Sequence, residues 1–510
     1  MRRHFLLRTL ACLTSLLCLW ALLLAPTAHA ADDGTLRIGS KRFTESYILA
    51  ELLAQTAAPH LRSAPLVRQG LGNTAIVYEA LRSGSIDLYA EYTGTIALEI
   101  LKSPQPLSRE AMQAALQPLG LGLAIPLGFN DGYAFAMRAD EARRLGIRTL
   151  SDLAKHPELK LGLTNEFIGR ADGWRGVAAQ YGLTQTPTGL DHGIAYDAIA
   201  ARQVDVIDIY TTDAKIDHLG LVVLQDDRAY FPRYDAVVLY RLDVPQRFPA
   251  AWEALASLEG RIDEPAMIAM NARAELQGAG FATIARDFLA GGDPAKPSAG
   301  APTGFIAKLI DPDLGRLARQ HLTLVAVSVG IAVLIGVPLA VLVFPHVRLR
   351  ALVLGATGLL QTVPSLALLA ILISLLGAIG TLPALIALTL YSLLPIMRNA
   401  VTGLAEVPVG VKQAGTALGM TAAQNLQLVQ LPLALPTLIA GIRTATTIAI
   451  GTATIAAFIG AGGFGERIVT GLALNDRALL LAGAVPAAAL ALLSELLFEA
   501  LEGLLRRGRY

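Results

Sequence analysis

Apolar and polar residues follow different patterns in the two halves of this 510-residue chain. From about Asp32 to Gly292, charged residues are spread evenly among alternating apolar and polar positions. From about Leu317 onward, apolar runs of around 20 residues recur, which is the length needed to cross roughly 30 Å of hydrocarbon. We therefore expect a soluble α/β region followed by an all-α membrane region.

The soluble half opens with a strand, a polar loop and a helix. Leu36 to Gly39 is a short apolar strand, and an apolar-periodic stretch from Tyr47 to Thr56 follows a polar loop. The same order returns near Leu159 to Val177 and around Val204 to Ile209. This repetition is expected for two α/β lobes in which a ligand lies where loops leave the sheet edges.

The apolar runs predict five membrane spans, and basic residues set their orientation. If the soluble half is exported, Arg348 and Arg350 after the first span and Arg398 near the end of the third fall on the cytoplasmic side, as the positive-inside rule prefers. Gln361 to Pro364 interrupts the second span and favours either a break that faces a pathway or a simple packing kink. The spans are about His321 to Phe344, Leu352 to Leu376, Leu382 to Val401, Pro436 to Ile459 and Leu479 to Phe498.

A polar, helix-forming segment, Gln413 to Pro432, lies between the third and fourth spans and so on the cytoplasmic side. Small residues follow one side of its first helix, and Gly419 marks a turn. A second helical piece, Ala422 to Leu431, is expected to end at Pro432, because proline lacks an N–H and its ring clashes with the preceding turn. The resulting helical hairpin is either a docking loop for a partner or an amphipathic interfacial helix.

Composition supports the division into two parts. A chain that is 54% hydrophobic and only 16% charged is too apolar to be wholly soluble. The Pro-, Gly- and Ser-containing run from Gly291 to Gly304 is typical of a linker. The predicted domains are therefore a leader over residues 1–30, a soluble binding domain over 31–290, a linker over 291–316 and a transmembrane domain over 317–510.

The N-terminus predicts export. Arginines precede an apolar run from Thr9 to Ala25, and Ala28 to Ala30 has the small-x-small form of a cleavage site, so the segment is a signal peptide or an uncleaved signal anchor. Both cysteines, Cys12 and Cys18, lie inside it. If the segment is removed, neither disulfides nor thiol chemistry can belong to the mechanism.

Several strings resemble known transport proteins. GSKRFTES, EYTGT and the string from Tyr210 to Asp213 resemble the periplasmic binding proteins that capture glycine betaine, choline and related quaternary amines, over about Leu36 to Leu289. QTVPSLALLA, LYSLLPIMRN, LPLALPTLIAGIRTA and AAFIGAGGFG resemble the permease of the same ABC importers, over about His321 to Glu502. The resemblance implies a two-lobed type II periplasmic binding protein, of α/β fold, fused to an all-α transmembrane permease of about five core helices.

The resemblance assigns a binding site. A trimethylammonium group offers no hydrogen-bond donor and is best held by the faces of aromatic rings, at about 0.5 to 2 kcal/mol each. Without the resemblance, each tyrosine would be read as a packing residue and each basic residue as a surface charge. The resemblance places the cage at Tyr92, Tyr133, Tyr210 and Tyr234, a carboxylate-binding group at Lys41, Thr95 and Arg170, and Asp131 near the cationic end.

The resemblance also makes the cytoplasmic hairpin the coupling loop that docks on a separate ATPase. Gln413 stands where the family usually has Glu, and Gly415 where it has Ala, so a salt bridge from the first position is absent. The matching residues are Gln413, Ala414, Gly415, Gly419, Leu431 and Pro432. Because no stretch fits the phosphate-binding motif GxxxxGK[ST], we expect ATP and magnesium to bind to that partner and no cofactor to bind to this chain.

Together these features predict the binding and membrane-spanning subunit of an ATP-driven importer for glycine betaine or a related quaternary ammonium osmoprotectant. Choline, carnitine and ergothioneine are alternative ligands, and a ligand-binding membrane sensor or a secondary transporter is an alternative function. An enzyme is not expected, since no nucleophile–base or metal constellation is recognisable. The expected assembly is a permease homodimer with two ATPase copies, in contact with lipid of the bacterial inner membrane, with its binding domain in the periplasm. No Lys/Arg cluster in the soluble half indicates nucleic acid.

Overall fold

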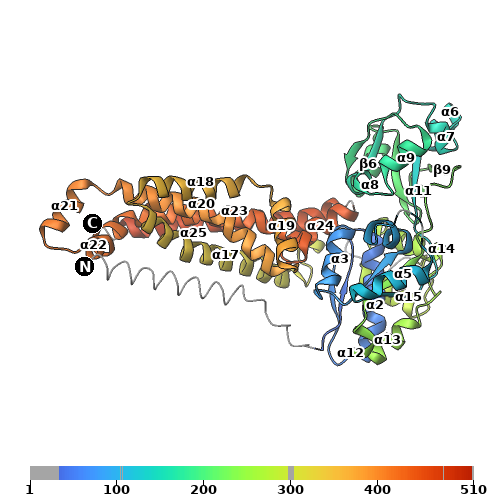
Figure 1. The fold of residues 1–510 in the computed structure, drawn as a ribbon, viewed down its shortest axis with the longest axis horizontal. Coiled ribbons are helices and arrows are strands. Elements are labelled where there is room, and N and C mark those ends of the chain that lie inside the picture. The colour runs from blue at the N-terminus through green and yellow to red at the C-terminus, as the bar shows by residue number, and fades with distance from the viewer. Residues whose placement is uncertain (1–33, 104, 106, 297–303, 475, 508–510) are drawn as a thin grey trace.

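The structure is a computed structural model that describes residues 34–507 except 104, 106, 297–303 and 475. The expected signal segment, both cysteines and part of the expected linker lie outside the described residues. Figure 1 shows an elongated arrangement, with an α/β region at one end and a bundle of long helices extending away from it. The all-α prediction for the second half is confirmed.

The first lobe of the α/β region is a five-stranded sheet in the order β2-β1-β3-β10-β4. Strand β1 runs parallel to β2 and β3, whereas β10 is antiparallel to both β3 and β4. Its strands are β1 (Arg37–Gly39), β2 (Leu66–Arg68), β3 (Leu88–Tyr92), β4 (Leu121–Ala124) and β10 (Ala236–Arg241). Its helices are α2 (Thr44–Ala57), α3 (Thr74–Arg82), α4 (Thr93–Thr95), α5 (Arg109–Leu116), α12 (Val244–Arg247), α13 (Pro249–Ala256), α14 (Glu264–Glu275) and α15 (Phe281–Leu289).

The second lobe has a sheet of the same size in the order β7-β6-β8-β5-β9. The chain enters and leaves it through two crossings, which are joined by a bridge between Asn130 and Asp235. The two-lobed α/β prediction is therefore confirmed. Its strands are β5 (Tyr133–Arg138), β6 (Leu161–Thr164), β7 (Thr188–Leu190), β8 (Val206–Tyr210) and β9 (Leu221–Leu224). Its helices are α6 (Ala139–Leu145), α7 (Leu150–Leu153), α8 (Asn165–Gly169), α9 (Trp174–Tyr181), α10 (His192–Ala200) and α11 (Lys215–His218).

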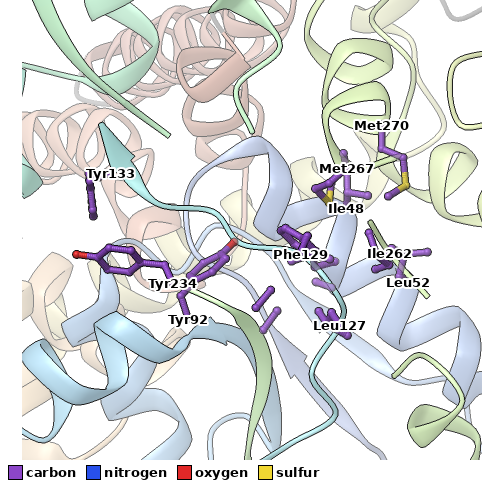
Figure 2. Close-up of a cluster of buried hydrophobic side chains, with 14 of the residues drawn as sticks. Ile48, Leu52, Tyr92, Leu127, Phe129, Tyr133, Tyr234, Ile262, Met267 and Met270 are labelled. Carbon is purple, nitrogen blue, oxygen red and sulfur yellow. The ribbon is translucent and has the colours of Figure 1, made fainter. Parts of the chain in front are cut away.

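The core of the first lobe extends to the crossings between the lobes. Ile48 and Leu52 of α2 pack with Phe129, and three tyrosines belong to the same buried cluster. Figure 2 shows Tyr92, Tyr133 and Tyr234 on one side of this cluster. Because close packing restricts side chains to few rotamers, these rings are held in place by the core itself.

The membrane half contains four helices long and apolar enough to cross a bilayer, or five if the bent pair α18 and α19 counts as one span, within the part of the chain that the structure describes. The two helices of the pair meet at 101°, so the expected second span is not a straight helix. The break falls at Pro364, and the carbonyl oxygen of Val363 accepts a hydrogen bond of 2.7 Å from the Tyr391 hydroxyl. This bond satisfies a carbonyl group that has no helical partner at the break between the two helices. The helices are α17 (Leu314–Val343), α18 (Val347–Thr362), α19 (Ser365–Leu376), α20 (Thr381–Glu406), α23 (Leu431–Ala453) and α25 (Arg477–Arg507).

Helix α20 forms the centre of the bundle and packs against α17 and α23. Glycines allow the close approach to α23. A Cβ on Gly403 would lie 2.9 Å from the carbonyl oxygen of Ala434, and a Cβ on Gly441 would lie 2.9 Å from that of Pro395. Small residues at such contacts let helix backbones approach each other, which is how helices associate where no water drives their packing.

The cytoplasmic hairpin differs from its prediction at one end. Helix α21 (Val409–Ala417) and helix α22 (Ala422–Asn425) flank a turn in which Gly419 has a φ of 79°. The expectation that Pro432 ends the second helix is wrong, because residues 422–453 form one long helix. A π-helical turn, Leu426–Gln430, precedes the proline, which lies in the first turn of α23. There the missing N–H interrupts no regular α-helical hydrogen bond.

Two short helices were not predicted. Helix α16 (Phe305–Leu309) lies inside the expected linker over 291–316 and packs against α25, where Lys308 pairs with Asp476. After α23, a 3₁₀ segment, η5 (Ile455–Ile459), leads through three glycines with positive φ to helix α24 (Gly465–Leu474). Figure 1 shows α24 at the end of the bundle nearest the α/β region.

Candidate ligand-binding site

The four tyrosines assigned to the cage lie together between the lobes. Tyr133 and Tyr210 face each other across the β5–β8 ladder with ring centroids 5.2 Å apart, and Tyr133 meets Tyr234 edge-on at 5.8 Å. Phe43, which sequence reasoning did not assign, lies 5.1 Å from Tyr210 and 6.3 Å from Tyr92. Phe43 therefore connects Tyr92 to the other rings. Burial raises the pKa of all four phenols, which keeps them neutral.

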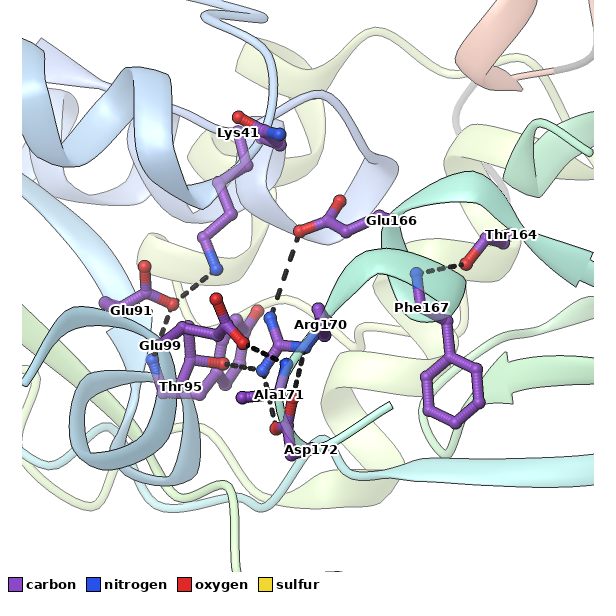
Figure 3. A network of polar contacts seen from close by, with 12 residues as sticks. Lys41, Glu91, Thr95, Glu99, Thr164, Glu166, Phe167, Arg170, Ala171 and Asp172 are labelled. Atoms are coloured by element: carbon purple, nitrogen blue, oxygen red, sulfur yellow. Dashed lines mark hydrogen bonds and ion pairs between the residues drawn. The ribbon is translucent and has the colours of Figure 1, made fainter. Parts of the chain in front are cut away.

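Arg170 is a buried cation at the side of this cage. Its guanidinium carbon lies 5.0 Å from the centroid of the Tyr133 ring. Its Nε and Nη2 each donate to Asp172 over 2.7 Å, and Nη2 also donates to Thr95 of the first lobe over 3.2 Å (Figure 3). The planar fork that we expected to hold a ligand carboxylate is thus already occupied by Asp172. Only the edge carrying Nη1, which lies 3.9 Å from Glu166, could face a ligand.

A local turn brings Arg170 and Asp172 side by side. A Cβ on Gly173 would lie 1.8 Å from the carbonyl oxygen of Phe167, so this close turn between α8 and α9 accepts only glycine. The Tyr234 hydroxyl also donates to Asp172 over 2.6 Å. Asp172 therefore positions Tyr234 and Arg170 at once. The sequence did not reveal this role, because it depends on the close turn at Gly173 and on a tyrosine 62 residues away.

Lys41 lies beside the Tyr92 ring of the cage and is also paired. Its Nζ forms an ion pair with Glu91 and lies 5.1 Å from the centroid of the Tyr92 ring. Glu91 also accepts hydrogen bonds from the Tyr89 hydroxyl and the Tyr92 amide, each over 3.0 Å. Lys41 thus compensates a fully buried carboxylate, and any contact with a ligand would be made in addition to that pair.

Two carboxyl groups share one hydroxyl at the boundary between the lobes. The Thr212 Oγ1 lies 2.6 Å from Glu45 of the first lobe and 2.9 Å from Asp131 at the crossing. Thr212 has one hydroxyl hydrogen, so both contacts are full hydrogen bonds only when one of the two acids carries a proton and donates to Thr212. Burial raises the pKa of Glu45 to about 7, against hydrogen bonds from Thr212, Tyr92 and Asn271 that lower it. Burial and the neighbouring Glu45 likewise raise the pKa of Asp131.

A histidine extends this acidic region. His192 stacks on Tyr210 with centroids 4.5 Å apart, and its Nε2 lies 3.0 Å from Asp213. Burial lowers the pKa of His192, but the attraction of Asp213 outweighs it and raises the pKa to about 9. Asp213 in turn has a lowered pKa, because the pull of His192 and several hydrogen bonds exceed the effect of burial. His192 and Asp213 are thus a charged pair at neutral pH.

The lobes are closed over this site. Besides the bonds of Arg170 and Thr212, the Ala171 amide donates to Glu99 of the first lobe over 2.6 Å. A residual cavity of about 10 Å³ remains, lined by residues of both lobes and by Ala473 of α24. Within the described residues, no three His, Cys, Asp or Glu side chains are grouped so that they could hold a metal ion.

The hairpin residues assigned to ATPase coupling lie at the end of the bundle away from the binding lobes (Figure 1). Gln413, Ala414 and Gly419 are exposed. Gly415 is buried, and a Cβ there would lie 2.6 Å from the Asn425 amide nitrogen, so it allows α21 and α22 to pack closely. Leu431 and Pro432 begin α23.

Family comparisons agree with this division. Residues 34–291 match the substrate-binding domain of the ABC-type glycine betaine transport system. The chain belongs to this family. Residues 332–507 match the inner membrane component of binding-protein-dependent transport systems. The protein is therefore a substrate-binding domain fused to the permease of an ABC import system, a transport subunit that crosses the inner membrane several times.

Three relatives cover the two halves. The chain is 47% identical over 193 residues to the osmoprotectant import permease protein OsmW of Salmonella typhimurium, covering 37% of this chain and 90% of OsmW. It is 35% identical over 279 residues to the glycine-betaine-binding protein of Pseudomonas aeruginosa, covering 51% and 89%. It is 32% identical over 271 residues to the ergothioneine transport permease/ergothioneine binding protein EgtU of Helicobacter pylori. That match covers 51% of this chain and 48% of EgtU, about half its length.

The pairing of Arg170 with Asp172 predicts a loss of stability in Asp172→Asn. The substitution keeps the shape but leaves a buried guanidinium without its counter-charge, which costs about 3 to 5 kcal/mol when such a pair is broken. We expect a clearly lower unfolding temperature for the binding domain. Thermal unfolding of the full-length protein is monitored by tryptophan fluorescence. Asp140→Asn is the control, since its pair with Arg202 is exposed on both sides and such pairs contribute about 0 to 1 kcal/mol. Equal shifts in the two variants would contradict a stabilising role for Asp172.

Proposed function

We propose that this protein captures glycine betaine or a related quaternary ammonium compound and passes it through its own permease domain in an ATP-driven import cycle. The observation that carries the proposal is the closed cleft in which buried tyrosines meet Glu45 and Asp131, on a chain that continues into a permease. Neutral rings attract a diffuse cation through their negative faces, and the acids supply a counter-charge.

The same site suits several ligands. The cationic head that glycine betaine, carnitine and choline have in common fits the rings and acids, as does the trimethylammonium group of ergothioneine. A ligand carboxylate would meet the Nη1 edge of Arg170, with Thr95 and Lys41 nearby. Relatives named for glycine betaine, osmoprotectants and ergothioneine support this ligand class.

The remaining parts of the transporter are proposed from the permease domain. A separate ATPase subunit would bind ATP and magnesium and dock on the hairpin of Gln413 to Pro432. This docking would depend on the shape of the hairpin and on the turn at Gly419. The permease would work as a homodimer in the inner membrane, with the binding domain of each copy in the periplasm. Tethering would keep each binding domain at an effective concentration of order millimolar beside its permease.

The proposal is tested by transport in proteoliposomes. The full-length protein is reconstituted with its ATPase, and uptake of radiolabelled glycine betaine, choline and ergothioneine is measured with ATP or with a non-hydrolysable analogue. We expect uptake of at least one compound only with ATP, together with ligand-stimulated ATP hydrolysis. Uptake that persists without hydrolysable nucleotide would refute the importer function and favour a secondary transporter.

The position of Arg170 predicts ligand selectivity. Arg170→Ala removes the guanidinium whose Nη1 edge could meet a ligand carboxylate, so it should weaken the binding of glycine betaine at least tenfold more than that of choline, which lacks a carboxylate. Calorimetry on the purified full-length protein measures both affinities. Arg144→Ala, in an exposed ion pair with Glu141, is the control. Equal losses for the two ligands would exclude Arg170 from recognition of the carboxylate.

The shared proton predicts a pH dependence of binding. Below about pH 7, Glu45 carries a proton and its neutral acid attracts a cation less. Affinity for choline, which has no group titrating in this range, should therefore rise from pH 5.5 to pH 8, by at most about tenfold per unit below the pKa. Glu45→Gln should bind choline weakly and with little pH dependence, whereas Glu141→Gln, on helix α6 away from the site, should follow the wild type. If the affinity of the wild type for choline did not depend on pH, Glu45 would not have to lose its proton for the ligand to bind.

A further inference from the structure

The outer end of the permease contacts both lobes of the binding domain. Phe458 of η5 lies against the first lobe, where a Cβ on Gly72 would be 3.6 Å from its carbonyl oxygen. Helix α24 lies against the second lobe, where a Cβ on Gly193 of α10 would be 2.7 Å from the carbonyl oxygen of Leu472. The distance at Gly193 is too short for a side chain, so glycine is required there, whereas Gly72 lies at ordinary van der Waals distance from Phe458. One continuous permease segment therefore spans the mouth of the cleft.

Arg42 lies where these three bodies meet. It belongs to the loop between β1 and α2, and its amide donates to the carbonyl oxygen of Gly72 over 3.1 Å. Its guanidinium carbon lies 4.9 Å from the centroid of the Phe458 ring. Its Nη2 lies 3.3 Å from Asp191, the residue that precedes α10 in the second lobe. A single cation thus contacts the first lobe, the second lobe and the permease.

The two contacts of Arg42 depend on different movements. The contact with Asp191 joins residues of opposite lobes, so it can form only when the cleft is closed. The contact with Phe458 joins the binding domain to the permease, so it can form only when the domain is docked. A planar guanidinium can stack on a ring with its face while its edge donates to a carboxylate, which lets both contacts exist at once.

From this arrangement we propose that Arg42 is the residue through which closure of the cleft is reported to the permease. When the lobes close, Asp191 holds the guanidinium in the orientation that stacks on Phe458, and η5 and α24 are held together against both lobes. When the lobes open, Arg42 loses Asp191 and the stacking geometry is no longer fixed. This inference rests on the proposed function and assigns a positioning residue within it, because Arg42 acts on Phe458 and not on the ligand's cage.

The pair is partly exposed, with 28% of the Arg42 side chain and 26% of the Asp191 side chain accessible. Substitutions here should therefore leave folding intact. Another arginine, Arg68, offers a matched control. Arg68 of β2 in the first lobe also faces the permease, since a Cβ on Gly380 would lie 3.2 Å from its Nη1. Within the described residues, Arg68 forms no ion pair with the second lobe.

The experiment measures affinity and coupling separately. The full-length protein is reconstituted with its ATPase in lipid nanodiscs, using glycine betaine, choline or ergothioneine, whichever the wild type binds most tightly. For Arg42→Gln we expect an affinity within threefold of the wild type but a loss of at least fivefold in ligand-stimulated ATP hydrolysis. Phe458→Leu and Asp191→Asn should likewise keep the ligand affinity and lose ligand-stimulated ATP hydrolysis. Arg42→Lys should restore part of the stimulation, because it keeps the charge without the planar face.

A double variant separates this role from a general docking defect. Arg42→Gln combined with Phe458→Leu should lose no more stimulation than either single variant, since both remove one contact. Arg68→Gln should retain stimulation. Normal stimulation in Arg42→Gln, additive losses in the double variant, or a loss of affinity that matches the loss of stimulation would each overturn the assignment. A wild type without ligand-stimulated hydrolysis would instead refute the proposed function itself, and this inference with it.

Discussion

The closed binding domain depends on how one buried cation is compensated. Arg170 has lost most of its water, and an isolated charge in that position would be strongly destabilising. Asp172 neutralises it, the face of Tyr133 covers it, and Thr95 accepts a hydrogen bond from it across the cleft. The same interactions bring Tyr234 to its place through Asp172. The shape of the cage thus follows from the requirement that this charge be paired.

A second set of charges lies where the lobes meet. Glu45, Asp131, Asp213 and His192 are all buried or nearly so, and hydrogen bonds connect the acids to Thr212 and to the cage tyrosines. The arrangement holds more acceptors than donors, so a proton on one of the acids would complete its hydrogen bonds. A cation that entered the cage would relieve the same excess. The proposed binding of a positive ligand is consistent with this excess of acids, while the neutral rings would supply contact area without adding charge.

In the membrane half, backbone polar groups at helix breaks also need hydrogen-bond partners, and they find them in other ways. Where Pro364 breaks the second span, a tyrosine of α20 satisfies the free carbonyl group. Where Pro432 enters the fourth, a π-helical turn precedes it and the helix continues. Glycines bring α20 and α23 into backbone contact. The long helices extend from the hairpin at one end of the bundle towards η5 and α24 at the other, where the permease touches both lobes.

Sequence patterns by themselves determined the two halves, the approximate spans and the helical hairpin, whereas the cage tyrosines were assigned by resemblance to a family. These features are local, because hydrophobic periodicity and turn residues act over a few neighbouring positions. The pairing of Arg170 with Asp172 was missed although only one residue separates them, because it depends on the close turn at Gly173. The bond between Thr212 and Glu45 spans 167 residues, and the contact of Arg42 with Phe458 joins two domains. Only the tertiary structure decided these contacts, since they depend on the path of the chain and on which buried charges must compensate one another.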